Sequence, residues 1–318
     1  MSRLEWDQPS GTPEYDRAMV DQLQAERMTS GAGFIAALDQ SGGSTPKALE
    51  DYGIGRDAYS SEAEMYELID RMRARIVMSP AFGGDRVLAA ILFEETLTRE
   101  FDRKPAARYL WEIKGVVPFV KIDKGLAEPV DGVQLMKPIP HLDETLRPAT
   151  RHGLFGTKAR SVIGAASATG IAAIVEQQFD VAQQVLAHGL IPILEPEITI
   201  TISDKVEAER LLLDELTARL ADIPEGQQVI LKLSLPTEPN LYLPLTGHPR
   251  VMRVVALSGG YSQAEADTLL ADDTGEIASF SRALLEGLSA HQSDLEFDAT
   301  LNRSIQAIYE ASVKPALP

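Results

Sequence analysis

The chain has 318 residues, no cysteine, and 30 Lys+Arg against 47 Asp+Glu, which gives a net charge of −17 at pH 7. A chain this acidic repels the phosphates of nucleic acids and of anionic membranes, so we expect neither as a partner. Without cysteine it forms no disulfide, thiolate metal site or thiol nucleophile, and its composition is typical of a soluble, cytoplasmic globular protein.

The N-terminal residues 1–15 are expected to form a poorly ordered extension. The first ten residues contain no apolar core of a signal peptide, and the longest uncharged stretch, Ser161–Val175, is too short to span a bilayer. No linker divides the chain, so we predict that residues 1–318 form a single domain with no membrane role.

Short apolar runs rich in Val, Ile and Leu alternate along the chain with longer amphipathic stretches. Eight such runs are present: Gly33–Asp39, Val87–Glu95, Val117–Asp123, Phe155–Arg160, Leu190–Glu197, Val229–Leu235, Met252–Ser258 and Glu276–Arg282. Continuous apolar character is typical of strands that are buried on both faces, as in a parallel sheet.

Amphipathic segments between these runs predict helices. The clearest are Glu62–Val77, Ala168–His188, Asp204–Leu220 and Gln263–Leu270, with Ser61 and Ser262 as N-caps and His188-Gly189 as a C-terminus. Strands that alternate with helices predict an α/β fold, a single-domain (β/α)8 TIM barrel, followed by C-terminal helices after Ala283. The alternative is a doubly wound sheet, but no glycine-rich dinucleotide loop follows the first strand.

Most of the apolar runs end in polar or charged residues, which a barrel would gather on one rim, where barrel active sites form. These ends are Asp39, Glu94 and Glu95, Lys121 and Asp123, Lys158 and Arg160, Glu195 and Glu197, Lys232, Ser258 and Arg282. Alternate residues of a strand face opposite sides, so Lys232 lies on the face away from Leu231 and Leu233. We assign Lys232 to the barrel interior and the leucines to the helices.

A buried lysine is costly unless it is paired or loses its charge. For one isolated lysine, a buried salt bridge is the simpler interpretation. Here Lys121, Lys158 and Lys232 lie on three strands and face several carboxylates. A neighbouring Lys158 would disfavour the charged form of Lys232 and leave an amine that can attack a carbonyl. The pattern therefore predicts Schiff-base catalysis, with a carboxylate such as Glu195 as the general acid/base.

Two glycine-containing loops follow the first and seventh strands: Asp39-Gln-Ser-Gly-Gly-Ser-Thr-Pro-Lys47 and Leu257-Ser-Gly-Gly-Tyr-Ser262. Ser-Gly-Gly before a helix exposes backbone N–H groups that can hold an anion, although a single copy is more often a plain turn. Two copies, with Lys47 and Arg282 nearby, favour a substrate that carries a phosphate at each end. The cations Lys47, Lys121, Lys158, Lys232 and Arg282 would make this rim positive despite the acidic average.

The five histidines do not indicate a metal site, because none ends a strand and no two have metal-ligand spacing. They are His141, His152, His188, His248 and His291. We therefore predict no bound metal.

Taken together, these residues resemble the class I (Schiff-base) fructose-1,6-bisphosphate aldolases, and the compact bacterial type in particular. The resemblance runs from about Gly31 to about Val313. Its motifs are Phe34–Lys47, Ile91–Thr96, Val120–Gly125, Phe155–Arg160, Ile193–Ile198, Leu231–Leu233, Leu257–Gly260 and Ala278–Arg282.

The resemblance implies a role for each catalytic residue. Lys232 forms the Schiff base, Glu195 accepts and donates protons, and Glu197 lies in the same pocket. Lys158 stabilises developing negative charge, Asp39 orients the C4 hydroxyl or the iminium, and Lys121 lies beside it. The implied substrate and phosphate ligands are Ser258, Gly259, Gly260 and Arg282 for the dihydroxyacetone half, Ser41, Ser44 and Lys47 for the distal phosphate, and Arg160.

The implied activity is metal-independent, reversible cleavage of fructose 1,6-bisphosphate to dihydroxyacetone phosphate and glyceraldehyde 3-phosphate. It is a lyase reaction of glycolysis and gluconeogenesis and needs no cofactor, because the iminium is the electron sink. Since members of this family are often tetramers, a homo-oligomer is also an expectation. The chain departs from many animal-type members at Gln40, where they carry Glu, at Ala48, where they carry a basic residue, and at Ser281, where they carry Gly.

Two alternatives stay open at the level of the sequence. One is another Schiff-base barrel, of the transaldolase or deoxyribose-phosphate aldolase type, but two phosphate cradles favour a bisphosphate substrate. The other is a non-catalytic barrel that binds a sugar phosphate. Binding alone does not require Lys232, Lys158 and Glu195 together, so their presence favours an enzyme.

Overall fold

The computed structural model describes residues 14–41, 45–97 and 99–313, and within them eight parallel strands close into a barrel. In barrel order these are β1 (Phe34–Leu38), β2 (Val87–Leu92), β5 (Val117–Lys121), β7 (Gly156–Ile163), β8 (Ile191–Ile198), β9 (Val229–Ser234), β10 (Val251–Leu257) and β11 (Glu276–Phe280). Strand β11 returns to β1, with Ser279 opposite Ile35, which closes the barrel. The predicted (β/α)8 barrel is confirmed, and the doubly wound alternative is wrong.

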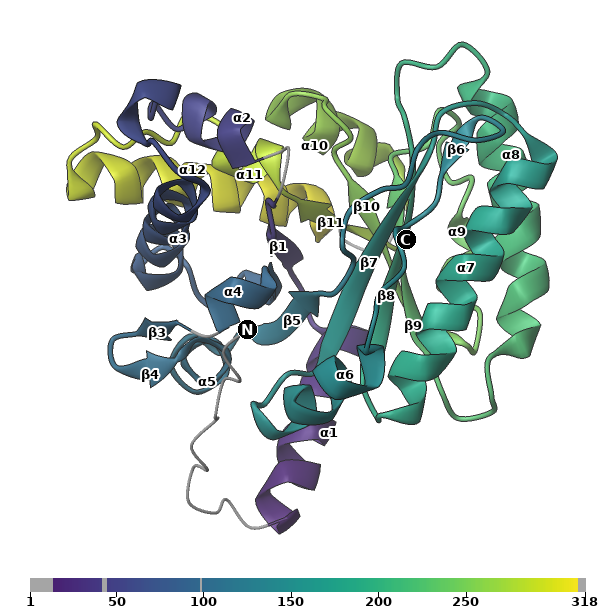
Figure 1. Ribbon diagram of the computed structural model, residues 1–318, viewed down its shortest axis with the longest axis horizontal. Helices are drawn as coiled ribbons and strands as arrows, with labels where there is room; N and C mark the ends of the chain where they lie inside the picture. Colours follow the sequence, from purple (N-terminus) through teal and green to yellow (C-terminus); the bar gives the residue numbers. More distant parts are fainter. Residues whose placement is uncertain (1–13, 42–44, 98, 314–318) are drawn as a thin grey trace.

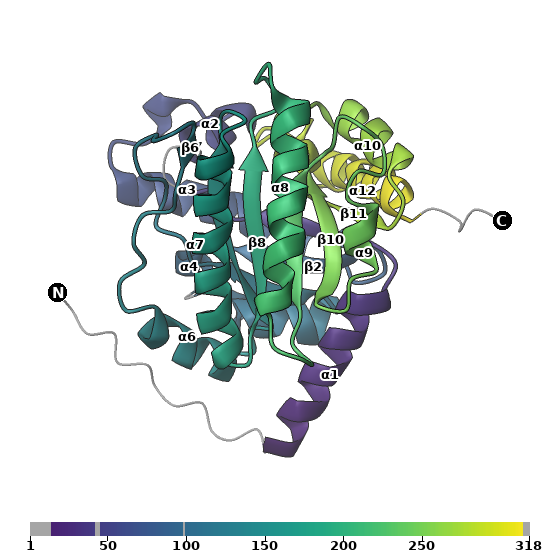
Figure 2. The same ribbon diagram turned by 90° about the vertical axis from the view of Figure 1, so that its right-hand side faces the viewer.

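Helices surround the barrel, as Figure 1 shows. They are α1 (Glu14–Ser30), α2 (Thr45–Asp51), α3 (Glu62–Met78), α4 (Glu94–Leu97), α5 (Ala106–Arg108), α6 (Leu142–Arg151), α7 (Ala168–Ala187), α8 (Lys205–Arg219), α9 (Leu243–Thr246), α10 (Gln263–Asp272), α11 (Arg282–Leu285) and α12 (Asp294–Ser312). In Figure 2, α7 and α8 stand side by side over the outer face of the barrel around β8. The last two helices confirm the predicted C-terminal helices.

Strand parity separates the barrel interior from its outer face. Leu231 and Leu233 belong to the apolar cluster that includes Leu212 of α8, between the strands and the helices. Ile230 belongs to the interior cluster, which includes Phe119 of β5. Alternate residues of β9 therefore face opposite sides, as predicted, and Lys232 follows Ile230 on the interior face.

Local helix signals are satisfied where the sequence predicted them. The Ser61 hydroxyl accepts a hydrogen bond from the Glu64 backbone N–H and caps α3. Ser262 forms a capping box with Glu265 at the start of α10. At the end of α7, His188 is the C-cap, and Gly189 adopts the left-handed φ of +73° that favours glycine.

Several element boundaries differ from the predictions. Strand β2 ends at Leu92, and Glu94 and Glu95 belong to the short helix α4 instead of to the strand. Strand β7 continues three residues past Arg160, to Ile163, because its pairing with β8 and β6 (Val133–Gln134) extends that far. Of the predicted extension, residues 1–13 lie outside the described residues, and residues 14 and 15 belong to α1 instead.

A two-residue hairpin, which the sequence did not indicate, joins β3 (Glu100–Phe101) to β4 (Lys104–Pro105). Its two turn residues, Asp102 and Arg103, both have positive φ, at 48° and 61°.

In the described part of the chain, no helix combines the length and the apolar character needed to cross a membrane.

Candidate active site

A cavity of about 750 Å³ opens at the carboxyl ends of the barrel strands. Most of the predicted site residues line it: Asp39, Ser41, Lys47, Lys121, Lys158, Arg160, Glu195, Glu197, Lys232, Ser258, Gly259 and Arg282. Gly260 does not line the cavity but lies beside Arg282, whose guanidinium nitrogens are 3.6 Å from where a Cβ on this glycine would stand. Ser44 lies outside the described residues. The fold therefore gathers on one rim residues that are scattered along the sequence.

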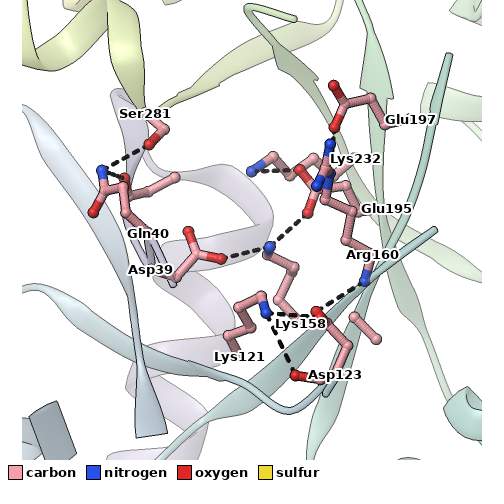
Figure 3. A network of polar contacts seen from close by, with 12 residues as sticks. Asp39, Gln40, Lys121, Asp123, Lys158, Arg160, Glu195, Glu197, Lys232 and Ser281 are labelled. Atoms are coloured by element: carbon pink, nitrogen blue, oxygen red, sulfur yellow. Dashed lines mark hydrogen bonds and ion pairs between the residues drawn. The ribbon is translucent and has the colours of Figure 1, made fainter. Parts of the chain in front are cut away.

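A buried cluster of charges forms the floor of the cavity (Figure 3). Lys158 Nζ on β7 lies 2.5 Å from Asp39 Oδ2 and 2.6 Å from Glu195 Oε2. Lys232 Nζ on β9 lies 3.0 Å from Glu195 Oε1. Glu195 of β8 thus joins two lysines from the neighbouring strands, and the side chains of the three are at most 5% exposed.

The cluster fixes the charge states of its members. Burial alone would lower the pKa of Lys158, but Asp39 and Glu195 outweigh it, so the pKa is raised and Lys158 is an ammonium. Burial alone would raise the pKa of Asp39, but the charges of Lys158 and Lys232 hold it well below its ordinary value. The pKa of Glu195 is also lowered, because the same two lysines outweigh its burial. Both carboxylates are therefore anionic at neutral pH and able to accept a proton.

Two further pairs extend the cluster along the interior. Lys121 Nζ lies 2.7 Å from Asp123 Oδ1, and Arg160 pairs with Glu197. Asp123 Oδ2 also accepts a hydrogen bond from the Arg160 backbone N–H. Four basic groups, on residues 121, 158, 160 and 232, thus face four carboxylates, on residues 39, 123, 195 and 197. Lys121, Lys158 and Lys232 thus lie at the cavity as expected, but neighbouring carboxylates compensate their positive charges.

The outer rim carries the groups predicted to bind phosphate. Gly259 and Gly260 have φ of +59° and +119°, a conformation that favours glycine, and their turn closes with a hydrogen bond from the Tyr261 N–H to the Ser258 carbonyl. Lys47 pairs with Asp51 at 2.5 Å and is 66% exposed. The pKa of Lys47 is raised by the hydrogen bond and charge of Asp51, and the positive charge of Arg282 opposes this rise. Lys47 and Arg282 therefore lie on the same side of the rim, above the neighbouring strands β1 and β11.

Other cavity residues were not among the predicted site residues. Asp123 had a usable signal, since it ends a strand two positions after Lys121. Gln40 and Ser281 directly follow and precede predicted residues. Tyr66 of α3 and Phe93 stack at a centroid distance of 5.9 Å in the cavity wall. The sequence does not separate such aromatic residues from ordinary core residues.

All five histidines lie in turns and loops of the described structure, outside its helices, and none of them ends a strand, as predicted. Across the described ranges, no group of three or more His, Asp or Glu side chains is arranged to hold a metal ion.

Comparisons with known proteins agree with one another. The family model of class-I fructose-bisphosphate aldolase matches residues 22–241. A curated relative, fructose-bisphosphate aldolase class 1 of Synechocystis sp., is 56% identical over 293 residues, which are 92% of this chain and 98% of that protein.

Solved structures share the fold. One is a fructose-bisphosphate aldolase of Plasmodium falciparum in ternary complex with TRAP and a small-molecule inhibitor. It matches with a TM-score of 0.74 at 20% identity, over 97% of this chain and 99% of that one. Cgl0159 of Corynebacterium glutamicum matches with a TM-score of 0.52 at 14% identity, over 96% of this chain and 99% of that one.

Proposed function

Because the chain belongs to the class-I fructose-bisphosphate aldolase family, a family of lyases that act on sugar phosphates, we propose that it cleaves fructose 1,6-bisphosphate through a Schiff base on Lys232. The observation that carries this proposal is the 3.0 Å contact of Lys232 with Glu195 on the closed floor of the cavity. Family membership decides against a transaldolase, a deoxyribose-phosphate aldolase and a non-catalytic barrel.

Substrate binding begins at the rim. Arg282 binds the phosphate of the dihydroxyacetone half, together with Ser258 and the backbone N–H groups of Gly259 and Gly260. Ser41, Lys47 and Arg160 remain the candidates for the rest of the substrate. This arrangement directs the C2 carbonyl toward the floor, where Lys232 lies.

Schiff-base formation uses the contact between Lys232 and Glu195. Glu195 takes a proton from Lys232, and the free amine adds to C2 to give a carbinolamine. Glu195 then returns a proton to the departing hydroxyl, which leaves as water, and the iminium remains on Lys232. Glu197, paired with Arg160, lies in the same pocket.

Carbon–carbon cleavage follows from the position of Asp39. The C3–C4 bond breaks, its electron pair moves into the iminium to give an enamine, and the C4 hydroxyl proton passes to Asp39 as the aldehyde forms. The Lys158 ammonium, 2.5 Å from Asp39, stabilises the negative charge on this path. Protonation of the enamine at C3 and hydrolysis of the iminium release dihydroxyacetone phosphate and restore Lys232.

The iminium is the electron sink in this sequence of steps, so we propose that the reaction needs no metal. We also propose that the chain acts as one domain in the cytoplasm, because its sequence shows no linker and has the composition of a cytoplasmic protein. We propose a homo-oligomer because members of the family are often tetramers. Sedimentation of the purified protein tests the oligomer, and full activity in EDTA tests metal independence.

The Schiff base has a direct test. Borohydride added with dihydroxyacetone phosphate should trap a covalent adduct on Lys232, detectable by peptide mass spectrometry, and abolish activity. Lys232→Met should give no adduct and no turnover, whereas Lys137→Met, at an exposed lysine, should behave as the wild type. Full activity after borohydride treatment, or an adduct on a different lysine, would overturn the assignment.

A further inference from the structure

A hydrogen-bonded bridge between Gln40 and Ser281 lies in the cavity and has no part in the proposed mechanism. Gln40 follows Asp39 directly and is 7% exposed. Its Nε2 donates to Ser281 Oγ at 2.8 Å and to the Ala37 carbonyl at 3.3 Å (Figure 3). Because a carbonyl can only accept a hydrogen bond, the NH2 end of the amide must face this side. Both of its N–H groups are thereby occupied.

Gln40 is also held from behind. Arg73 of α3 is fully buried and donates from Nη2 to the Gln40 carbonyl. Its Nη1 donates to Asp70 Oδ1 and Thr96 Oγ1, both at 3.0 Å. The backbone of Gln40 is therefore anchored to α3 while its side chain reaches β11, which makes it a fixed bridge between two parts of the rim.

The far end of this bridge adjoins Arg282. Lys47, Lys121, Lys124, Lys158, Arg160 and Lys232, the other cations of the cavity, each pair with a carboxylate. Among the described residues, Arg282 forms no such ion pair, and its charge is available to a phosphate. Ser281, to which Gln40 donates, is the preceding residue and the N-cap position of the four-residue helix α11.

We propose that Gln40 is a positioning residue for Arg282: its amide holds Ser281 in place, and its neutrality leaves the guanidinium free for the substrate phosphate. A carboxylate at position 40 would stand about 3 Å from Ser281 Oγ, one residue from Arg282, and would compete with the phosphate for the guanidinium. It would also face the Ala37 carbonyl with no hydrogen to donate. This inference rests on the proposed function, because it takes Arg282 as a phosphate ligand.

Two substitutions separate the two parts of the proposal. Gln40→Glu should raise both KM for fructose 1,6-bisphosphate and the inhibition constant of inorganic phosphate by about tenfold or more, because it adds an internal competitor. Gln40→Met removes the two N–H donors of the amide without adding charge, so it should raise KM and the inhibition constant of phosphate by about threefold. In each variant kcat should fall less than about threefold, since the floor of the cavity is unchanged. Gln184→Glu, at an exposed glutamine of α7, controls for the added charge and should match the wild type.

Ser281→Ala tests the bridge from its other end. Its KM and its inhibition constant for phosphate should resemble those of Gln40→Met. The double variant Gln40→Met/Ser281→Ala should have values no higher than either single variant, because both substitutions remove the same hydrogen bond. Clearly additive losses would contradict the bridge. Thermal unfolding of each variant identifies any general loss of folding.

Further measurements separate failure of this inference from failure of the proposed function. If the wild type forms no borohydride-trapped adduct, the Schiff-base mechanism fails. If Arg282→Met leaves inhibition by inorganic phosphate unchanged, the assignment of Arg282 fails. The positioning role alone is refuted if trapping is normal and Arg282→Met weakens inhibition by inorganic phosphate, but Gln40→Glu has the same KM as Gln184→Glu. It is also refuted if Gln40→Glu lowers kcat instead of raising KM.

Discussion

Replacing Lys158 with methionine would remove the cation that the floor of the cavity depends on most. Its ammonium contacts both Asp39 and Glu195, at 2.5 and 2.6 Å, and its side chain is 3% exposed. Removing one partner of a buried ion pair costs about 3–5 kcal/mol, because the remaining charge loses its compensation. Here Asp39 would lose its ion pair and Glu195 would keep only Lys232, so we expect a loss of stability of this size at neutral pH and an activity reduced at least about 100-fold.

The pH dependence of this loss distinguishes charge from packing. In the wild type, the lowered pKa values of Asp39 and Glu195 stabilise the fold above the unfolded pKa of about 4, and this contribution is lost as the pH falls. In the Lys158→Met variant, we expect the pKa values of Asp39 and Glu195 to be raised, because the nearest cation is missing. The two charged carboxylates then destabilise the fold at neutral pH, and this destabilisation decreases as they take up protons at lower pH. The difference in the free energy of unfolding between the wild type and Lys158→Met should therefore become smaller as the pH falls from about 7.5 to about 5.

Urea unfolding at both pH values is the assay, with circular dichroism as the signal. The double variant Lys158→Met/Glu195→Gln should be more stable than Lys158→Met alone, because it removes an uncompensated charge. A loss below about 1 kcal/mol at pH 7.5, or a gap that does not change with pH, would refute the view that Lys158 is the main counter-ion.

Three further predictions concern single positions. Glu195→Gln should lower kcat by about 10² to 10⁴ with KM little changed in steady-state assays, and a normal kcat would move the acid/base role elsewhere. Asp267→Asn should raise the melting temperature near pH 8, because burial and Glu286 raise the pKa of Asp267 to about 6. The ionised Asp267 carboxylate destabilises the fold by about 1 kcal/mol, since the group is partly exposed, and this cost is present above pH 6 and disappears towards pH 4. An equal rise in the melting temperature of Asp267→Asn at pH 8 and at pH 4 would contradict this explanation. Arg103→Gly should stabilise the β3–β4 turn by about 0.5–1 kcal/mol in urea unfolding, because Arg103 has φ of +61°; a loss would show that its side chain contributes more than the strain costs.

The positions of the strands could be predicted from the local composition of the sequence, but the residues at which the strands end could not. The strands of a closed barrel are buried on both faces, so each one is an apolar run that a single sequence displays. The ends depend on neighbours. The run from Val87 stops as a strand at Leu92 because α4 begins at Glu94, whereas β7 continues to Ile163 because β8 and β6 supply partners. Pairing of this kind is not encoded in the composition of the run itself.

The sequence by itself determined the barrel and the inward face of Lys232, because the alternation of side chains along a strand is a local property. The family resemblance then marked Lys232 and Glu195 as partners, and the tertiary structure places them 3.0 Å apart. Only the tertiary structure decided how the charges pair, because pairing depends on how neighbouring strands are staggered around the barrel. Gln40 and Ser281 are the clearest case: each is a separate departure from many animal-type members, yet across 241 positions their side chains share one hydrogen bond. That contact exists because closure brings the last strand against the first.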